Sequence, residues 1–595
     1  MFSMFKKIWW YIKANWLRYV LAITFLNLAS LASVIAPKLL EAGIDKIVNK
    51  TITKSSLLAL FGMMIAVTVG GYLISWLWNY LLFGASIKLE YTIRRNYFRH
   101  LLKMDSHFFD KNSSGDLMTR ATVDLNAIAM TAGYGILTLV DSVVYLIMIL
   151  FMMMYTISFK LTIIVLIPIV FIGLGVKILG EKIHAAYAQS QIAFGEMNNL
   201  VLESIIGIRV TKAYVQEHAE IEKLKASGAN AYRKNNRLVR INALFDPLFR
   251  AAFTAASAIA FGVGAYLVFR RELTPGQLVS FVVYLGMLGW PMFALGDLVN
   301  IMSRGNASYD RIDNIMSQTP EVKEPAAPVA VGPTFKKLEF RDVTFAYPGS
   351  EFPAVENISF TLEKGKTLGI VGKTGSGKTT IIRLLLKQYC LRKGEVAING
   401  VNIKDIAAGE VRGFFGYVPQ EHILFSGAIY KNIAFGKENA GAEEIGAAAA
   451  AAAFQKDLET FDEGLDTVVG EHGVTLSGGQ KQRLAIARAL ISDPEILILD
   501  DSLSAVDGTT EAEILQNLKK ARKGKSAIIV AHRLTAVERA DEIIVMDNGR
   551  IAERGSHEEL MKLGKWYYRQ YTRQQLTYKT GVEKDDPSAD LEIRE

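Results

Sequence analysis

Cysteine is almost absent from this sequence, with Cys390 the single example in 595 residues. One thiol cannot form an internal disulfide bond, and no Cys and His residues cluster with the spacing of a zinc site. Folds held together by disulfides or by zinc are therefore excluded, and Cys390 is interpreted as a buried or inert thiol.

Long stretches without charge fill the first half of the chain. Residues 1–302 contain several such apolar runs, whereas residues 338–575 have the composition of a soluble α/β domain. Hydrophobic residues make up 50% of the whole and the mean hydropathy is +0.21, both high for a wholly soluble protein. Because a chain of this length does not build one core, we expect two or more domains, the first in a membrane.

Six apolar stretches are close to or above the ~20 residues that cross a bilayer. They lie at about 16–36, 57–83, 133–155, 161–180, 251–269 and 278–302. No small-residue cleavage site follows the basic and aromatic start, "MFSMFKKIWWYIKANW". We therefore expect an interfacial helix there and not a signal peptide. Residues 1–317 are predicted to form an α-helical polytopic domain with six transmembrane helices.

The distribution of Lys and Arg predicts the orientation. Basic residues concentrate in segments 84–132 and 181–250, and the alternate loops are short and poor in charge. The positive-inside rule places both segments and both termini in the cytoplasm of a plasma-membrane, multi-pass protein. The net charge of +8 is then explained by topology and not by a nucleic-acid partner.

The two basic segments are expected to be long cytoplasmic extensions of the spanning helices. They consist of helix-forming sequence with turns predicted near 105–116 and 211–217, and such turns are natural docking points for a soluble domain.

Two acids lie inside the predicted spans, Asp141 and Asp297. An intramembrane acid suggests a functional contact with substrate or a proton. The alternative is an acid that pairs with a neighbouring helix or faces a water-filled cavity, and the sequence does not decide between them. Pro291 is expected to kink the sixth span.

A Pro- and Ala-rich stretch ends the membrane half. Residues 318–337 are interpreted as a linker, residues 338–575 as an α/β domain, and residues 576–595 as a polar, disordered tail.

A glycine loop between an apolar strand and an apolar helix is the strongest motif. Its backbone N–H groups and the following helix N-terminus are suited to phosphate oxygens. Lys378 is expected to reach the outer phosphates of ATP, and the Thr379 hydroxyl to ligate Mg²⁺. The predicted loop consists of Gly372, Lys373, Thr374, Gly375, Ser376, Gly377, Lys378, Thr379 and Thr380.

Two further motifs complete the expected site. "ILILD" is a buried strand that ends in Asp500, which is predicted to hold Mg²⁺ through water. "LSGGQ" opens an amphipathic helix and provides a second phosphate-binding helix N-terminus. One γ-phosphate does not need two such cradles from one chain, so we expect this helix to face the P-loop of a partner domain.

These motifs together resemble the nucleotide-binding domain of ATP-binding cassette (ABC) transporters, an α/β P-loop NTPase domain of ABC type. Six spans followed by one such domain resemble an exporter half-transporter. The resemblance implies that Tyr347 stacks on adenine, that Gln420 contacts Mg²⁺ and the attacking water, and that His532 contacts the γ-phosphate. It implies that Ser477, Gly478, Gly479 and Gln480 bind the partner's γ-phosphate. Gly470 and Glu471 resemble a segment that touches the intracellular loops, and residues 504–507 a loop that crosses between the two domains.

Asp501 departs from the family, which has glutamate there to orient or deprotonate the hydrolytic water. Aspartate reaches about 1.5 Å less, one C–C bond, and a misplacement of about 1 Å can cost ~100-fold in rate. We therefore expect this chain's own site to bind ATP and hydrolyse it poorly. With its intact "LSGGQ", the chain resembles the degenerate-site subunit of bacterial heterodimeric multidrug exporters.

Other functions stay open. The favoured function is ATP-driven export of small hydrophobic or amphipathic substrates, drugs or lipids, by a chain that contacts membrane lipid and a second half-transporter. The alternatives are a homodimeric exporter or lipid flippase, an importer of metal chelates with the exporter fold, and a regulatory subunit that binds ATP. The sequence does not name the substrate, the direction of transport or the partner.

Overall fold

A computed structural model describes residues 3–470, 476–503 and 508–580, with side chains except at 171–177, 509 and 577–580. The chain forms two compact units. One consists of residues 1–102 and 115–318, and the other of residues 103–114 and 319–595. Glu471, the 504–507 loop and residues 581–595 of the predicted tail lie outside the described residues.

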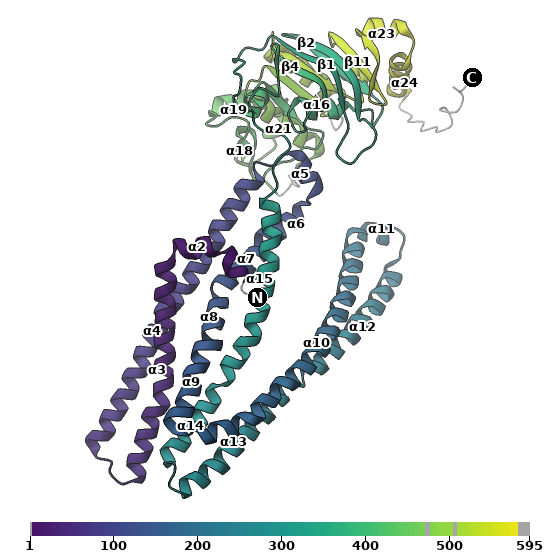
Figure 1. Cartoon of the computed structure of the whole chain (residues 1–595). Helices are drawn as coiled ribbons and strands as arrows, with labels where there is room; N and C mark the ends of the chain where they lie inside the picture. The colour runs from purple at the N-terminus through teal and green to yellow at the C-terminus, as the bar shows by residue number, and fades with distance from the viewer. Residues whose placement is uncertain (1–2, 471–475, 504–507, 581–595) are drawn as a thin grey trace. The chain divides into compact units, whose positions relative to one another are not determined.

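The first unit is entirely helical (Figure 1). Its helices are α1 (Ser3–Lys7), α2 (Trp9–Ala14), α3 (Trp16–Val48), α4 (Lys54–Leu101), α6 (Ser114–Thr119), α7 (Leu125–Ala132), α8 (Tyr134–Val140), α9 (Leu146–Phe151), α10 (Phe159–Ile206), α11 (Ile208–Ala213), α12 (Glu217–Asn242), α13 (Phe245–Phe269), α14 (Pro275–Met287) and α15 (Gly289–Met316). Three π-helical turns, η1 (Arg120–Asp124), η2 (Asp141–Tyr145) and η3 (Met152–Ile157), link α6 to α9 and extend α9.

Helix length confirms that the spans continue well past a bilayer. The α4 and α10 helices have 48 residues each, about 72 Å at 1.5 Å per residue, whereas the hydrocarbon core is ~30 Å thick. In Figure 1, α10 and α12 form a long antiparallel pair joined through α11, at the second predicted turn.

Five of the six predicted spans fall on helices that are long and apolar enough to cross a membrane. These are Trp16–Val48, Lys54–Leu101, Ser114–Ile157, Glu217–Phe269 and Pro275–Met316. The sixth, expected at 161–180, begins in the shorter apolar stretch Phe159–Val170 of α10, and the side chains at 171–177 lie outside the described residues.

Polar pairs join the 114–157 helices to α15. The Trp290 indole N–H donates to the buried Asp141 carboxylate at 2.7 Å, and the Tyr134 hydroxyl lies 3.5 Å from the Asp297 carboxylate. From residue 134 to residue 141 along one segment, the partners on α15 run backwards from residue 297 to residue 290. The two segments therefore run antiparallel in constant register. The buried Asp141 thus has the partner that a buried polar group needs, and the exposed Asp297 also contacts a neighbouring helix.

The predicted kink near Pro291 is a helix break. The α14 helix ends at Met287 and α15 begins at Gly289, because Pro291 has no N–H for the carbonyl four residues earlier.

The second unit contains two sheets packed on helices. Its strands are β1 (Lys337–Phe345), β2 (Val355–Glu363), β3 (Thr367–Gly372), β4 (Lys393–Ile398), β5 (Val401–Asn402), β6 (Phe415–Val418), β9 (Ile496–Asp500), β10 (Ser526–Val530), β11 (Glu542–Asp547) and β12 (Arg550–Gly555), with a small pair β7 (Gly427–Ala428) and β8 (Val468–Val469). One sheet has the order β2-β1-β4-β5 and is antiparallel; the other has the order β12-β11-β3-β10-β9-β6 and is parallel except at β12.

The helices of this unit surround the parallel sheet and build a helical side region. They are α5 (Ser106–Lys111), α16 (Lys378–Leu385), α17 (Ala408–Gly413), α18 (Ile429–Ala434), α19 (Ala442–Ala451), α20 (Gln455–Leu458), α21 (Gly478–Leu490), α22 (Gly508–Ala521), α23 (His557–Leu563) and α24 (Trp566–Thr580). In Figure 1, α18, α19 and α21 gather away from α23 and α24. The α24 helix continues to Thr580, past the predicted domain end at 575.

Candidate functional site

The carboxyl ends of four parallel strands bring the predicted motifs together. Strand β10 lies between β3 and β9, and β6 follows β9. Val530 is opposite both Ile370 and Asp500, and Val418 is opposite Leu499. The P-loop, His532, Asp501 and Gln420 therefore leave the same edge of the sheet, which is where ligands bind in open α/β folds.

The P-loop has the backbone that its glycines predict. Gly372, Gly375 and Gly377 have φ of 147°, 79° and 98°, which favour glycine over any residue with a Cβ. A Cβ on Gly377 would lie 2.5 Å from the Ala354 carbonyl oxygen, whereas one on Gly375 would meet open space. The loop is therefore tightly packed at its base and open where Gly375 lies.

Lys378 is buried beneath this loop. Its ammonium group donates to the carbonyl oxygens of Gly372 at 2.9 Å and Lys373 at 2.8 Å. Burial lowers the pKa of Lys378, and the charges of Asp501 and Asp500 act in the opposite direction. The loop thus combines one buried cation with a glycine backbone that is open at Gly375, which suits a polyphosphate.

Asp500 and Thr379 fit a magnesium ion. Thr379 Oγ1 donates to Asp500 Oδ1 at 3.2 Å, and no hydrogen bond from the described residues reaches the buried Asp500 Oδ2, although the Tyr417 hydroxyl is close enough to act on the pKa of this carboxylate. Burial raises the pKa of Asp500, a shift that the hydrogen bond from Thr379 opposes. No group of three or more acidic, His or Cys side chains is placed to hold a metal among the described residues. One carboxylate, one hydroxyl, water and phosphate are the usual ligands of Mg²⁺, so the pair fits such an ion.

Asp501 adopts a left-handed backbone, with φ of 48°, which aspartate tolerates better than most residues. Its N–H donates to the Val530 carbonyl at 2.8 Å, which fixes the turn to the neighbouring strand. The carboxylate lies close enough to Lys378 and His422 to act on the pKa of each. The structure therefore places Asp501 beside the P-loop lysine, on an arm one carbon shorter than glutamate.

His422 was not predicted as a site residue. It lies two residues after Gln420, and burial lowers its pKa while the charge of Asp501 raises it. Neutral imidazole is therefore favoured next to Asp501. A histidine within the "PQEH" turn at the end of β6 is the sequence signal that could have found it.

The structure places Gln420 and His532 at the sheet edge with exposed side chains. Gln574 of α24 forms hydrogen bonds on both sides of the turn at His532. Its side-chain N–H donates to the His532 carbonyl at 2.9 Å, and its side-chain oxygen accepts the Leu534 N–H at 2.9 Å. Gln574 was not predicted, because its contact spans 42 residues.

Tyr347 lies beside the first turns of the P-loop helix. Its hydroxyl is 3.1 Å from Thr380 Oγ1, and Arg383 donates to it at 3.4 Å. Its ring packs edge-on against Tyr389, with centroids 5.2 Å apart. The ring is therefore near the P-loop, as an adenine contact requires.

The signature helix is built separately from the P-loop. Ser477 caps α21: its hydroxyl oxygen accepts the Gln480 backbone N–H at 3.3 Å, and the Gln480 side-chain oxygen accepts the Ser477 backbone N–H at 2.9 Å. Gly478 and Gly479 form the first turn. No hydrogen bond among the described residues joins Ser477–Gln480 to the P-loop of the same chain.

Asp457 of α20 anchors this helix, and the sequence alone did not indicate it. Its carboxylate accepts both Arg483 N–H groups at 2.7 Å each and the Gln480 amide at 3.2 Å. A two-pronged Arg–carboxylate pair fixes direction as well as position, so Asp457 aims the N-terminus of α21.

The predicted docking turn near 105–116 belongs to the same compact unit as the α/β domain. The Asp105 carboxylate accepts the N–H groups of Glu321 at 2.6 Å and Val322 at 3.1 Å. The Tyr389 hydroxyl donates to Asp110 of α5. Since Tyr389 also packs on Tyr347, α5 is joined by direct contacts to the expected adenine side of the site.

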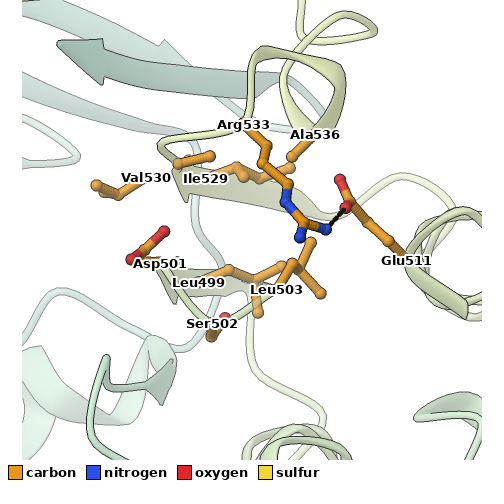
Figure 2. Close-up of a pocket in the computed structure, with 10 residues that line it drawn as sticks. Leu499, Asp501, Ser502, Leu503, Glu511, Ile529, Val530, Arg533 and Ala536 are labelled. Carbon is orange, nitrogen blue, oxygen red and sulfur yellow. Dashed lines mark hydrogen bonds and ion pairs between the residues drawn. The ribbon is translucent and has the colours of Figure 1, made fainter. Parts of the chain in front are cut away.

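A polar pair lines the same small cavity as Asp501. Figure 2 shows Arg533 and Glu511 joined by an ion pair of 3.2 Å, beside Leu499, Ser502 and Leu503. Glu511 is 4% exposed and belongs to α22, whereas Arg533 follows His532. The cavity that they line holds about 10 Å³, roughly the space of one water molecule. Glu511 therefore ties α22 to the residue next to the expected switch histidine.

We expect Glu511→Gln to lower the ATP turnover of this chain's own site about ten-fold, less than the ~100-fold that a 1 Å displacement of a catalytic group can cost. The amide keeps the shape of the side chain but removes the ion pair between Glu511 and Arg533, so His532 is held less firmly. Steady-state ATPase assays and nucleotide titrations of the chain without a partner half-transporter measure the effect, and nucleotide affinity should change little.

The matched control is Glu513→Gln on the same helix. Glu513 pairs with the exposed Lys456 at 3.1 Å, and such surface pairs contribute about 0–1 kcal/mol. Equal loss of turnover in both variants would assign the effect to α22 stability and not to His532.

Comparison with known proteins agrees with this geometry. Residues 19–292 match the ABC transporter transmembrane region and residues 355–504 match the ABC transporter family. The probable multidrug resistance ABC transporter ATP-binding/permease protein YheI of Bacillus subtilis is 47% identical over 576 residues, 97% of this chain and 98% of the relative. The multidrug resistance-like ATP-binding protein MdlA of Escherichia coli is 39% identical over 573 residues, 96% of this chain and 97% of the relative.

A solved structure shares the whole architecture. A bacterial Atm1-family ABC exporter with ATP bound superimposes with a TM-score of 0.76 at 25% identity, over 94% of this chain and 98% of that one. The fold and site define an ATP-driven membrane transporter with a helical membrane domain and a nucleotide-binding domain. The chain belongs to the ABC transporter family, within its exporters, and the two relatives named above are of the multidrug type.

Proposed function

We propose that this chain is one half of a heterodimeric ABC exporter whose two ATP sites are unequal. The observation that carries the proposal is Asp501, which stands beside Lys378 where the family has glutamate. A carboxylate on a shorter arm is poorly placed to activate water, whereas the residues that bind ATP do not depend on it.

In this proposal, ATP at the chain's own P-loop is held by Gly372–Thr380 and Tyr347, and the signature of the partner covers it. Thr379 and Asp500, with Gln420, would hold Mg²⁺, which neutralises charge on the phosphate oxygens. The second composite site pairs this chain's Ser477–Gln480 with the partner's P-loop and its glutamate. Hydrolysis there drives transport, with a histidine and a glutamine of the partner in the roles that the resemblance implies for His532 and Gln420.

Small hydrophobic or amphipathic compounds are the proposed substrates. The multidrug relatives support this class, as do the apolar spanning helices. We place both termini and the nucleotide-binding domain in the cytoplasm of a plasma-membrane protein, because the basic residues concentrate in 84–132 and 181–250. A homodimer with two slow sites is the alternative.

Reconstitution separates these possibilities. Vesicles with the chain alone are expected to show slow ATPase activity that amphipathic dyes stimulate weakly, because both sites then contain Asp501. Vesicles with the chain and a glutamate-bearing half-transporter from the same genome are expected to show stimulated ATPase and dye transport. Full stimulated turnover by the chain alone would assign it to the homodimer, and ATP binding with no dye movement in any pairing would assign it to a regulatory role.

A further inference from the structure

The corner between α2 and α3 contains an open pocket of about 310 Å³. The chain turns at Asn15, where α2 ends and the first spanning helix begins at Trp16, and α4 closes one side through Leu81. Asn15, Trp16 and Arg18 line its polar part, and Leu17, Leu21 and Leu81 its apolar part. The start of a spanning helix marks a membrane–water interface, so the pocket lies at the depth of lipid headgroups.

Arg18 is held against α4 by backbone carbonyl oxygens and by the Tyr80 ring, whose centroid lies 5.9 Å from the guanidinium carbon. Its Nε–H donates to the Leu81 carbonyl at 3.0 Å, and Nη2 donates to the Tyr80 carbonyl at 3.4 Å. A Cβ at position 84 would collide with the guanidinium, so Gly84 makes room for it. No carboxylate forms an ion pair with Arg18 among the described residues. The structure thus fixes an arginine at the interface with no carboxylate partner in the part of the chain that it describes.

The surroundings favour an anionic lipid over a protein acid as the missing partner. Residues 1–40 contain five basic residues and no Asp or Glu. Trp16, Leu17, Val20 and Leu21 around the pocket are 61%, 57%, 48% and 38% exposed. Apolar side chains exposed on a spanning helix are covered by acyl chains in a bilayer, and Trp prefers the interface itself.

We propose that this corner pocket binds a phospholipid with an anionic headgroup. Arg18 pairs with the headgroup phosphate, to which a guanidinium can donate two bonds at once. Asn15 and the Trp16 indole contact the polar headgroup, and the first acyl carbons lie along Leu17, Leu21 and Leu81. A lipid bound here would hold α2, α3 and α4 together at the interface, independently of the nucleotide site.

Lipid retention tests this proposal directly. The transporter, with its partner chain where one is needed, is purified in mild detergent, loaded from mixed micelles of phosphatidylglycerol and phosphatidylcholine, and analysed by native mass spectrometry. The wild type is expected to retain phosphatidylglycerol preferentially. Arg18→Gln should lower that retention about five-fold, as the loss of one basic residue near an anionic lipid predicts, and Arg18→Lys should restore part of it.

Matched variants separate a built site from surface charge. Lys13→Gln removes one charge from the same segment at an exposed position outside the pocket lining, and should retain lipid like the wild type. Leu21→Trp fills the apolar part, leaves Arg18 in place and should also lower retention, which keeps a test available if Arg18→Gln fails to assemble. Equal losses in Lys13→Gln and Arg18→Gln, equal retention of the two lipids, or displacement of the lipid by millimolar inorganic phosphate would overturn the proposal.

Discussion

Gly479→Asp in this chain is expected to lower the ATPase activity of the assembled transporter about 100-fold, and Ser477→Ala about ten-fold, whereas Asp501→Asn should change it about two-fold or less. Gly479 lies in the first turn of α21, where an acid would repel the γ-phosphate of the partner's ATP. Ser477 offers the hydroxyl at the cap of the same helix. In the unequal-site proposal, Asp501 is too short to act as an effective base, so its carboxylate contributes little to turnover. Steady-state ATPase assays of the purified pair, with one chain mutated at a time, measure all three effects.

The control for Ser477→Ala must remove a helix cap without touching the site. Ser556 provides it, because it caps α23 with the same reciprocal pair, its hydroxyl accepting the Glu559 N–H at 3.3 Å. Loss of such a cap costs about 1 kcal/mol of stability in both Ser477→Ala and the control Ser556→Ala. Only Ser477→Ala should reduce turnover strongly. Near-complete loss of activity with Asp501→Asn would contradict the unequal-site proposal and make Asp501 a working base.

Lys378→Ala is expected to weaken ATP binding at this chain's own P-loop about 100-fold, because hydrogen bonds to charged groups contribute about 1.5–3 kcal/mol each and the lysine offers several. Lys378 is 6% exposed and its ammonium already lies within the loop, 2.8 and 2.9 Å from two of its carbonyl oxygens. Its removal takes away the only cation that the structure buries under this loop among the described residues. Labelled-nucleotide binding to the chain measures the effect. Gly479→Asp blocks the competent site, so the binding that remains reports this chain's own P-loop.

Lys387→Ala is the matched control for loss of a buried lysine. Lys387 is 5% exposed, burial lowers its pKa as it does that of Lys378, and its ammonium donates to the Ile406 carbonyl at 2.8 Å, away from the P-loop. Both variants should unfold at lower temperature, and only Lys378→Ala should lose nucleotide. Unchanged nucleotide binding in Lys378→Ala would remove this lysine from the site.

Local patterns were sufficient for the elements that carry their own signal. The apolar runs predicted five of the six spans on helices of the required length, because about 20 apolar residues in a row have few other stable environments. The P-loop was recognisable because its glycines occupy a left-handed backbone at Gly375 and Gly377 that other residues avoid. The position of Asp500 followed from a buried strand that ends in an acid.

The side chains that orient those motifs were decided by tertiary structure. Glu511 meets Arg533 across 22 residues, Asp457 meets Arg483 across 26, and Gln574 meets His532 across 42.

The membrane half follows the same division. Its hydropathy placed Asp141 inside a span, but only the antiparallel packing of α15 brought Trp290 to it, across 149 residues. The sequence does not distinguish Arg18 from the other basic residues near the N-terminus. Its place in the pocket depends on the Leu81 carbonyl and on the space beside Gly84, both of α4. Sequence periodicity indicates which face of an element is apolar, but it does not indicate which distant element covers that face. Tertiary packing determines that pairing. In this chain, packing positions the groups around both the nucleotide site and the proposed lipid site.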